Sequence, residues 1–121
     1  MSDSMEHGVF DDPRPAQRLR IYVGEADRWQ GLPLYEAIVI QARELRLAGA
    51  TVLRGPMGFG ANSRIHTAKI LRLSEDLPIV VEIVDSPAKI ADLIPHLKQM
   101  VQGGLVTIED VGVLIYSPTS R

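Results

Sequence analysis

A glycine-rich segment is the part of this sequence whose residue types best suit ligand chemistry. It begins at Gly55, ends at His66 and reads GPMGFGANSRIH. Glycines let a backbone approach a phosphate closely, and successive N–H groups then form an anion-binding concavity. A hairpin connector needs the same freedom, but this segment is longer than the roughly 2–5 residues that hairpins use, and long loops usually carry function. Two interpretations stay open: a phosphate cradle and a flexible connector.

The segment matches neither of the two familiar nucleotide-binding motifs. In the pattern G-x-G-x-x-G that begins at Gly58 and Gly60, the third glycine is replaced by Ser63, and we expect a strand rather than a helix to follow. No Gly-Lys-Ser or Gly-Lys-Thr occurs, so there is no Walker loop. Four nearby cations could pair with phosphate or be ordinary strand-face charges: Arg54, Arg64, Lys69 and Arg72.

Other polar residues do not form a catalytic or metal-binding pattern. Ser63 and His66 are close enough for a hydrolytic dyad, with Asp76 or Asp85 to orient the imidazole, but a flexible glycine loop supplies neither a fixed elbow nor an oxyanion hole. The histidines and acidic pairs lack zinc or calcium spacing, so we expect no metal. Trp29 could stack on a base, although packing of its loop onto the sheet is favoured. We therefore expect a protein that is not an enzyme.

Composition narrows the class further. The 121 residues include 13 basic and 15 acidic side chains, a net charge of −2, and this balance argues against non-specific nucleic-acid binding. There is no cysteine, which excludes disulfides and thiolate chemistry. No apolar run reaches the roughly 18–20 residues that span a bilayer, and the acidic N-terminal residues do not resemble a secretory signal. We expect a cytoplasmic protein.

The hydrophobic pattern predicts strands that alternate with two helices. The first helix should begin at Pro33 and end near residues 47–49, with Gly49 as a left-handed cap. The second should follow the N-cap Ser86, and Pro95 should kink or divide it. The predicted strands cover residues 18–23, 51–54, 67–73, 79–84, and 105–116 with a break at residues 109–110.

These elements fit an α+β fold of the ferredoxin-like βαββαβ type, with two helices on one face of an antiparallel sheet. Residues 1–17 are polar and proline-broken, so we expect a disordered N-terminal tail, followed by a single domain over residues 18–121. Both faces of the strand over residues 79–84 are apolar. Because a monomer rarely exposes a large apolar face, we expect an oligomer.

Three longer stretches resemble a family of small bacterial proteins of unknown function with a PII-like fold. They are RLRIYVGEADRWQGLPLYEAIV, AGATVLRGPMGFGANSRIHTAKILRLSEDLPIVVEIVD and GGLVTIEDVGVLIY. More distantly, the chain resembles the PII nitrogen-regulatory signal proteins. That likeness lies in Gly49-Ala-Thr51-Val52, Gly58-Phe-Gly60, His66-Thr67 and Glu82-Ile-Val84.

The resemblance implies a homotrimer that binds an adenine nucleotide in clefts between subunits. Thr51 would approach the base, backbone amides at Gly58 and Gly60 would face the phosphates, and Asn62 would stand in for the glutamine of the PII proteins. The candidate ligand-binding residues are therefore Thr51, Gly58, Phe59, Gly60, Asn62, Arg64, Gly103 and Gly104.

The chain also departs from the PII pattern. Gln102-Gly-Gly-Leu105 replaces a longer phosphate-binding segment, and the loop has no tyrosine to modify. The ligand is then a smaller adenine nucleotide, another small anion, or none.

The function implied is a signalling regulator, in which ligand binding biases the conformation of residues 55–66 and the loop reports it to a partner protein. Relatives encoded beside a fluoride-exporting channel suggest a membrane channel or transporter as that partner. The alternative is a structural oligomer that binds no ligand.

Overall fold

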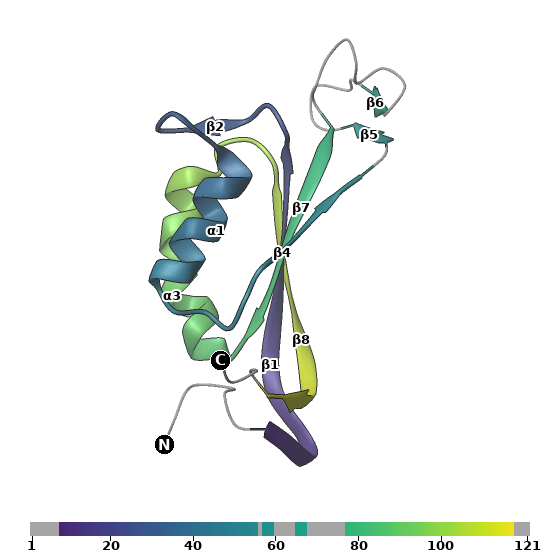
Figure 1. The fold of residues 1–121 in the computed structure, drawn as a ribbon, viewed down its shortest axis with the longest axis vertical. Helices are drawn as coiled ribbons and strands as arrows, with labels where there is room; N and C mark the ends of the chain where they lie inside the picture. The colour runs from purple at the N-terminus through teal and green to yellow at the C-terminus, as the bar shows by residue number, and fades with distance from the viewer. Residues whose placement is uncertain (1–7, 56, 60–64, 68–76, 118–121) are drawn as a thin grey trace.

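One antiparallel sheet carries two helices on the same face (Figure 1). The computed structural model describes residues 8–55, 57–59, 65–67 and 77–117. Within them the sheet has four strands in the order β4-β7-β1-β8. Their bounds are β1 Gly8–Gly24, β4 Thr51–Arg54, β7 Pro78–Asp85 and β8 Leu105–Tyr116. Helix α1 covers Leu34–Glu44 and helix α3 covers Pro87–Met100.

The order of these main elements is βαββαβ, which confirms the predicted ferredoxin-like class. Two short hairpins complete the described chain. One joins β2 (Arg28–Trp29) to β3 (Leu32–Pro33), and the other joins β5 (Met57–Phe59) to β6 (Ile65–Thr67). Near its two ends, the glycine-rich segment thus forms a two-stranded ribbon in which residues 57–59 pair with residues 65–67. The predicted strand over residues 67–73 lies outside the described residues beyond Thr67.

The core is aliphatic and lies between the sheet and the helices. Alternate residues of β7 are buried, and the same alternation in β1 directs Leu19, Ile21 and Val23 toward the helices. Ile38 of α1 and Ile90 of α3 are fully buried against them. Trp29 packs at the border of this cluster, which agrees with the packing role favoured for it.

Helix α1 ends earlier than expected, and Gly49 is not its left-handed cap. Arg46 takes the left-handed conformation, with φ of 61°. The N–H of Leu47 donates to the carbonyl of Ala42 at 3.0 Å, and the N–H of Arg46 donates to the carbonyl of Arg43 at 3.0 Å. This pair of bonds is the Schellman motif, which satisfies the last carbonyls of the helix without a glycine.

Helix α3 begins as predicted and is not divided at Pro95. The hydroxyl of Ser86 accepts a hydrogen bond from the N–H of Lys89 at 3.3 Å, and Pro87 occupies the first turn. Pro95 removes one backbone donor, but Leu93 and Leu97 on either side of it are buried in the core. Core packing therefore holds the helix together through the proline.

Strand β8 has no break at residues 109–110. The carboxylate of Glu109 accepts from Arg18 at 2.6 and 2.8 Å, and Asp110 accepts from Gln17 at 3.4 Å. Both acidic residues face these partners across the β1–β8 pairing. Two adjacent acidic residues are typical of a turn, but here cross-strand hydrogen bonds to β1 stabilise them within a continuous strand.

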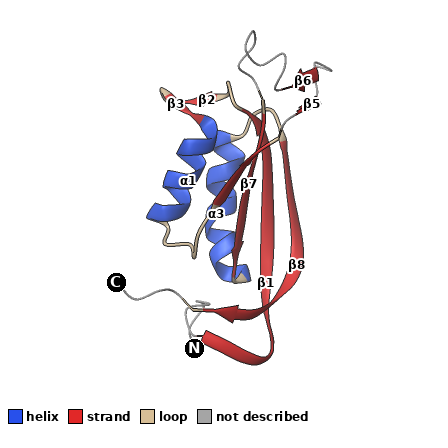
Figure 2. Cartoon of the chain, turned by 45° about the vertical axis from the view of Figure 1, so that its right-hand side comes forward, coloured by secondary structure: helices blue, strands red, loops and turns tan. Residues whose placement is uncertain are grey.

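The first strand begins earlier than the expected domain boundary at Arg18. Strand β1 begins at Gly8, and residues 14–17 pair with β8 beyond the bulge that follows Val9. Residues 8–17, which were expected in a disordered tail, thus belong to strand β1, while residues 1–7 lie outside the described residues. Because β7 pairs with β1 only over residues 17–24, residues 8–16 and 111–116 form a two-stranded extension, here called the arm (Figure 2).

No helix among the described residues is both long and apolar enough to cross a membrane.

The turn between α3 and β8 gives a test of the fold. Gly104 has φ of 150°, and a Cβ built on it would lie 2.5 Å from the backbone oxygen of Tyr22. We expect Gly104→Ala to lower the free energy of unfolding by about 1–3 kcal/mol. The measurement is equilibrium urea unfolding.

Gly103→Ala is the matched control, because no atom lies within 4 Å of a Cβ built there. Its free energy of unfolding should stay the same or rise by up to about 1 kcal/mol. Equal losses in the two variants would contradict the assignment of a conformational role to Gly104.

Candidate functional site

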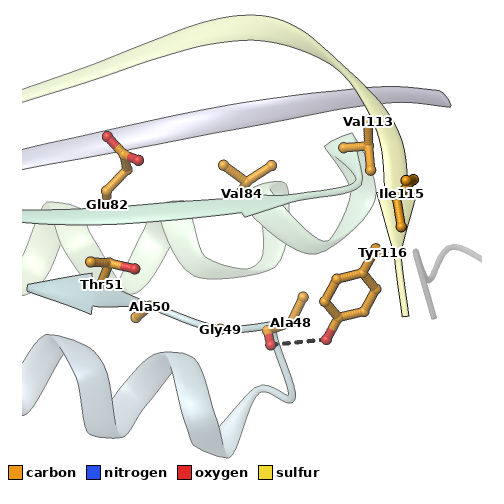
Figure 3. A pocket seen from close by; sticks show the side chains of 9 residues that line it. All are labelled: Ala48, Gly49, Ala50, Thr51, Glu82, Val84, Val113, Ile115 and Tyr116. Atoms are coloured by element: carbon orange, nitrogen blue, oxygen red, sulfur yellow. Dashed lines mark hydrogen bonds between the residues drawn. The ribbon is translucent and has the colours of Figure 1, made fainter. Parts of the chain in front are cut away.

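A pocket of about 410 Å3 lies where the end of the sheet meets the arm. Three segments form it: the connection from α1 into β4, the open face of β7, and the last residues of β8 (Figure 3). The side chains and backbone that line it belong to Ala48, Gly49, Ala50, Thr51, Glu82, Val84, Val113, Ile115 and Tyr116. Its volume is in the range of small-molecule sites.

Strand pairing places the polar groups of the pocket. Thr51 of β4 is the Cα partner of Glu82 in β7, so both side chains project from the same face of the sheet. Ile83 points into the core on the other face, and Val84 returns to the pocket side. The result is a hydroxyl and a carboxylate beside an apolar wall.

The carboxylate of Glu82 is held by an ion pair. Arg20 is its Cα partner in β1 and donates to it at 2.9 Å. This hydrogen bond is the main cause that raises the pKa of Arg20 above its usual value. A second nitrogen of Arg20 lies 3.5 Å from Glu109, which also pairs with Arg18. The two arginines and two glutamates balance in charge on the face that no helix covers.

The connection from α1 into β4 is fixed by a buried carboxylate. Asp85 is 3% exposed, and its two oxygens accept from the backbone N–H groups of Ala48 and Ser86, each at 2.7 Å. The ammonium of Lys89 donates to the carbonyl of Leu45 at 3.3 Å. These bonds tie the pocket wall to the start of α3. Asp85 was considered only as a partner for a histidine, whereas the structure gives it a backbone-fixing role.

The arm supplies the remaining wall. Beyond the bulge β8 turns across the end of the sheet toward Ala48 (Figure 3). Val113 and Ile115 line the pocket, and the hydroxyl of Tyr116 donates to the carbonyl of Ala48 at 3.1 Å. Ala48 is therefore held through its N–H by Asp85 and through its C=O by Tyr116.

The residues predicted to bind a ligand lie in different parts of the structure. Thr51 lines the pocket. Gly58 and Phe59 are in β5, beyond the other end of β4, and Gly60, Asn62 and Arg64 lie outside the described residues. Gly103 and Gly104 are in the turn from α3 to β8. A glycine is needed at position 104 because of its positive φ and the nearby backbone oxygen of Tyr22.

Gly103 lines a second, smaller hollow of about 230 Å3. Its other lining residues are Asp27, Arg28, Trp29, Leu34, Met100 and Gln102. The described residues thus do not bring Thr51 and Gly103 into one pocket.

Among the cations considered for phosphate binding, the guanidinium of Arg54 pairs with Glu25 at 2.5 Å, while Arg64, Lys69 and Arg72 are not described. No group of three potential metal ligands occurs within the described part of the chain.

Comparison with known proteins identifies the family. The DUF190 family model, described as uncharacterized ACR, matches residues 16–113. The chain belongs to this family. A UPF0166 protein of Aquifex aeolicus is 38% identical over 96 residues, covering 79% of this chain and 90% of the relative. A UPF0166 protein of Methanocaldococcus jannaschii is 33% identical over 99 residues, covering 81% and 91%.

Solved structures of CPII from Thiomonas intermedia K12 share the fold. One, bound to ADP and bicarbonate, has a TM-score of 0.63 at 16% identity and covers 84% of this chain and 90% of that one. Another, described as a nitrogen regulatory PII-like protein bound to ADP, AMP and bicarbonate, has a TM-score of 0.66 at the same identity and coverage. At this identity the comparison shows the fold alone, and that fold is PII-like.

The buried carboxylate of Asp85 gives a test of how the pocket is built. Asp85→Ala leaves the N–H groups of Ala48 and Ser86 without their acceptor, so we expect a loss of about 2–3 kcal/mol in the free energy of unfolding. Asp92→Ala, the same change at an exposed position of α3, should alter it by less than about 0.5 kcal/mol. Urea unfolding of both variants makes the comparison, and a neutral Asp85→Ala would contradict the role given to this carboxylate.

Proposed function

We propose that this protein is a PII-like regulator that binds an adenine nucleotide, with the base in the pocket at the end of β4 and the phosphates toward the loop that follows β4. The observation that carries the proposal is the meeting of Thr51, Glu82 and Val84 in one pocket, since the PII resemblance rests partly on the segments that contain them. CPII, which has the same fold, is bound to ADP.

The chemistry of the pocket favours the base over the phosphates. Most of the lining is apolar, and the one charged side chain among the lining residues is the carboxylate of Glu82. A carboxylate accepts a hydrogen bond from an amino group such as that of adenine, whereas it has no proton to donate to a phosphate oxygen. The hydroxyl of Thr51 adds a group that can donate or accept. The anionic end of the ligand therefore points away from Glu82.

Strand β4 leads from the pocket to the glycine-rich loop. Four steps of about 3.3 Å separate Thr51 from Gly55, a distance of roughly 13 Å along the strand. A base, a ribose and phosphates in line can extend along this path, whereas a single small anion cannot contact both ends. Backbone N–H groups near Gly58 then become the proposed phosphate donors, together with Gly60, Asn62 and Arg64 of the loop.

The uncovered face of the sheet supports a homotrimer. One row across all four strands is apolar and contains Leu53, Val80, Tyr22 and Leu105. Leu53 and Leu105 are more than half exposed in the single chain. The charged side chains on this face already pair with one another, so a second copy can cover the face without leaving a charge unpaired.

Signalling follows if the nucleotide prefers one state of the loop. A ligand shifts a conformational equilibrium only through different affinities for the two states. Contact between the phosphates and the loop supplies that difference, and the loop then presents one state to a partner protein. The family resemblance points to a membrane channel or transporter as the partner.

A structural oligomer without a ligand is the second candidate. It is favoured by the same exposed apolar row, which requires a covering copy whether or not a nucleotide binds. The two candidates predict the same assembly and differ in the response to nucleotide.

The assembly has a direct test. Light scattering of the purified chain should give a mass near three times 13.3 kDa. Leu53→Lys places a charge in the apolar row and should reduce that mass. Ile40→Lys, also at an exposed apolar position but on α1, is the control and should leave the mass unchanged. A monomeric wild type would contradict the trimer.

Nucleotide binding is tested by calorimetry with ADP. Thr51→Val keeps the shape of the side chain but removes the hydroxyl, and we expect it to weaken ADP binding by about fivefold, the effect of losing one hydrogen bond of about 1 kcal/mol. Thr107→Val makes the same change on β8 outside the pocket and should leave the affinity unchanged. If wild-type protein does not bind ADP, the ligand-free oligomer becomes the better candidate.

A further inference from the structure

The arm closes the candidate pocket with residues of the same chain. Val113, Ile115 and Tyr116 come from its β8 side, and they lie opposite the wall made by β4 and β7 (Figure 3). The family model ends at residue 113 and begins at residue 16, so Ile115, Tyr116 and residues 8–15 lie outside the matched region. Of the three side chains, Val113 is the last residue of the matched region, and Ile115 and Tyr116 follow it.

Tyr116 differs from the rest of the lining. It is the one aromatic side chain among the nine lining residues, and none of the nine is a cation. Its ring is half-buried and reaches from the end of β8 to Ala48 (Figure 3). An aromatic ring offers a flat apolar surface on which a heterocycle can stack, and such stacking does not depend on a particular base.

The ring is also held in place before any ligand arrives. The hydroxyl of Tyr116 donates to the carbonyl of Ala48. Ala48 is fixed in turn, because its own N–H donates to Asp85. At the other side of the arm, a Cβ on Gly112 would lie 2.8 Å from the Cβ of Pro13, so the two strands approach closely where the arm bends. A ring fixed in this way loses little conformational freedom when it binds.

We propose that Tyr116 is a specificity-determining residue whose ring stacks on the flat heterocycle of the ligand. This inference rests on the proposed function, because it assigns the base of the nucleotide to the end of the pocket that the arm closes. It adds that the arm selects for ligands with an aromatic ring, through a residue that lies beyond the matched residues 16–113.

The test is calorimetry of ADP with the full chain and two variants of Tyr116. Tyr116→Leu keeps an apolar side chain but removes the aromatic face, and the dissociation constant should rise about tenfold. Tyr116→Phe keeps the ring and loses the hydroxyl anchor, so the constant should rise by less than about threefold. Tyr35→Leu is the control, since it makes the same change on α1, away from the pocket, and should leave the constant unchanged.

A spectroscopic signature separates stacking from a structural effect. Adenine H2 and H8 resonances should move on binding to the wild type and to Tyr116→Phe because of the ring current. With Tyr116→Leu at saturating protein this movement should be largely lost.

Each other result overturns the inference. If wild type binds ADP and Tyr116→Leu binds it equally well, the stacking role is wrong while the proposed function stands. If Tyr116→Phe loses as much affinity as Tyr116→Leu, the hydroxyl rather than the ring is responsible. If wild type does not bind ADP, the proposed function fails, and the inference fails with it.

Discussion

The register of β7 between its two neighbours is the constraint on which the rest of the structure depends. β7 pairs with β1 along its whole length and with β4 over four residues. Because side chains alternate across a strand, a shift of one residue would turn the buried isoleucines toward solvent and Glu82 into the core. The same register sets Thr51, Glu82 and Arg20 in one row. Core and pocket are thus specified by one set of hydrogen bonds.

The pocket depends on contacts between residues that are far apart in the chain. Tyr116 contacts the backbone 68 positions earlier, and Asp85 contacts the same residue from 37 positions away. The side chain of Ala48 has no polar group, yet both its backbone N–H and its backbone C=O form hydrogen bonds to these two residues. The pocket therefore requires the closure of long loops, which costs conformational entropy. It forms only once the sheet and both helices are in place.

The sequence predicted the main elements because their patterns are local. An almost continuous apolar run identified the strand at residues 79–84, and Ser86 with Pro87 marked the start of α3. Predictions failed where distant residues decide the outcome. Glu109 is paired with Arg18 rather than in a turn, and the strand that begins at Gly8 exists because β8 is available to pair with it.

Of the residues that line the candidate pocket, Thr51 is the one that the sequence had singled out as a possible ligand contact. Glu82 was visible as the one charged residue within an apolar strand, but its neighbours depend on strand register. Tyr116 was not among the candidate binding residues, because its ring reaches Ala48 only through the bend of the arm. The end of α1 was also predicted wrongly. The left-handed residue there is Arg46 and not the expected Gly49, and backbone hydrogen bonds rather than residue type end the helix.

The arm also brings the two ends of the described chain together, since Gly8 is the Cα partner of Tyr116. Neighbouring ends permit a circular permutant, in which a short linker joins them and new termini are opened elsewhere. The same geometry governs how fusion proteins should be made. A fusion that begins directly at Gly8 or directly after Tyr116 would start beside the wall of the candidate pocket, since Tyr116 lines it.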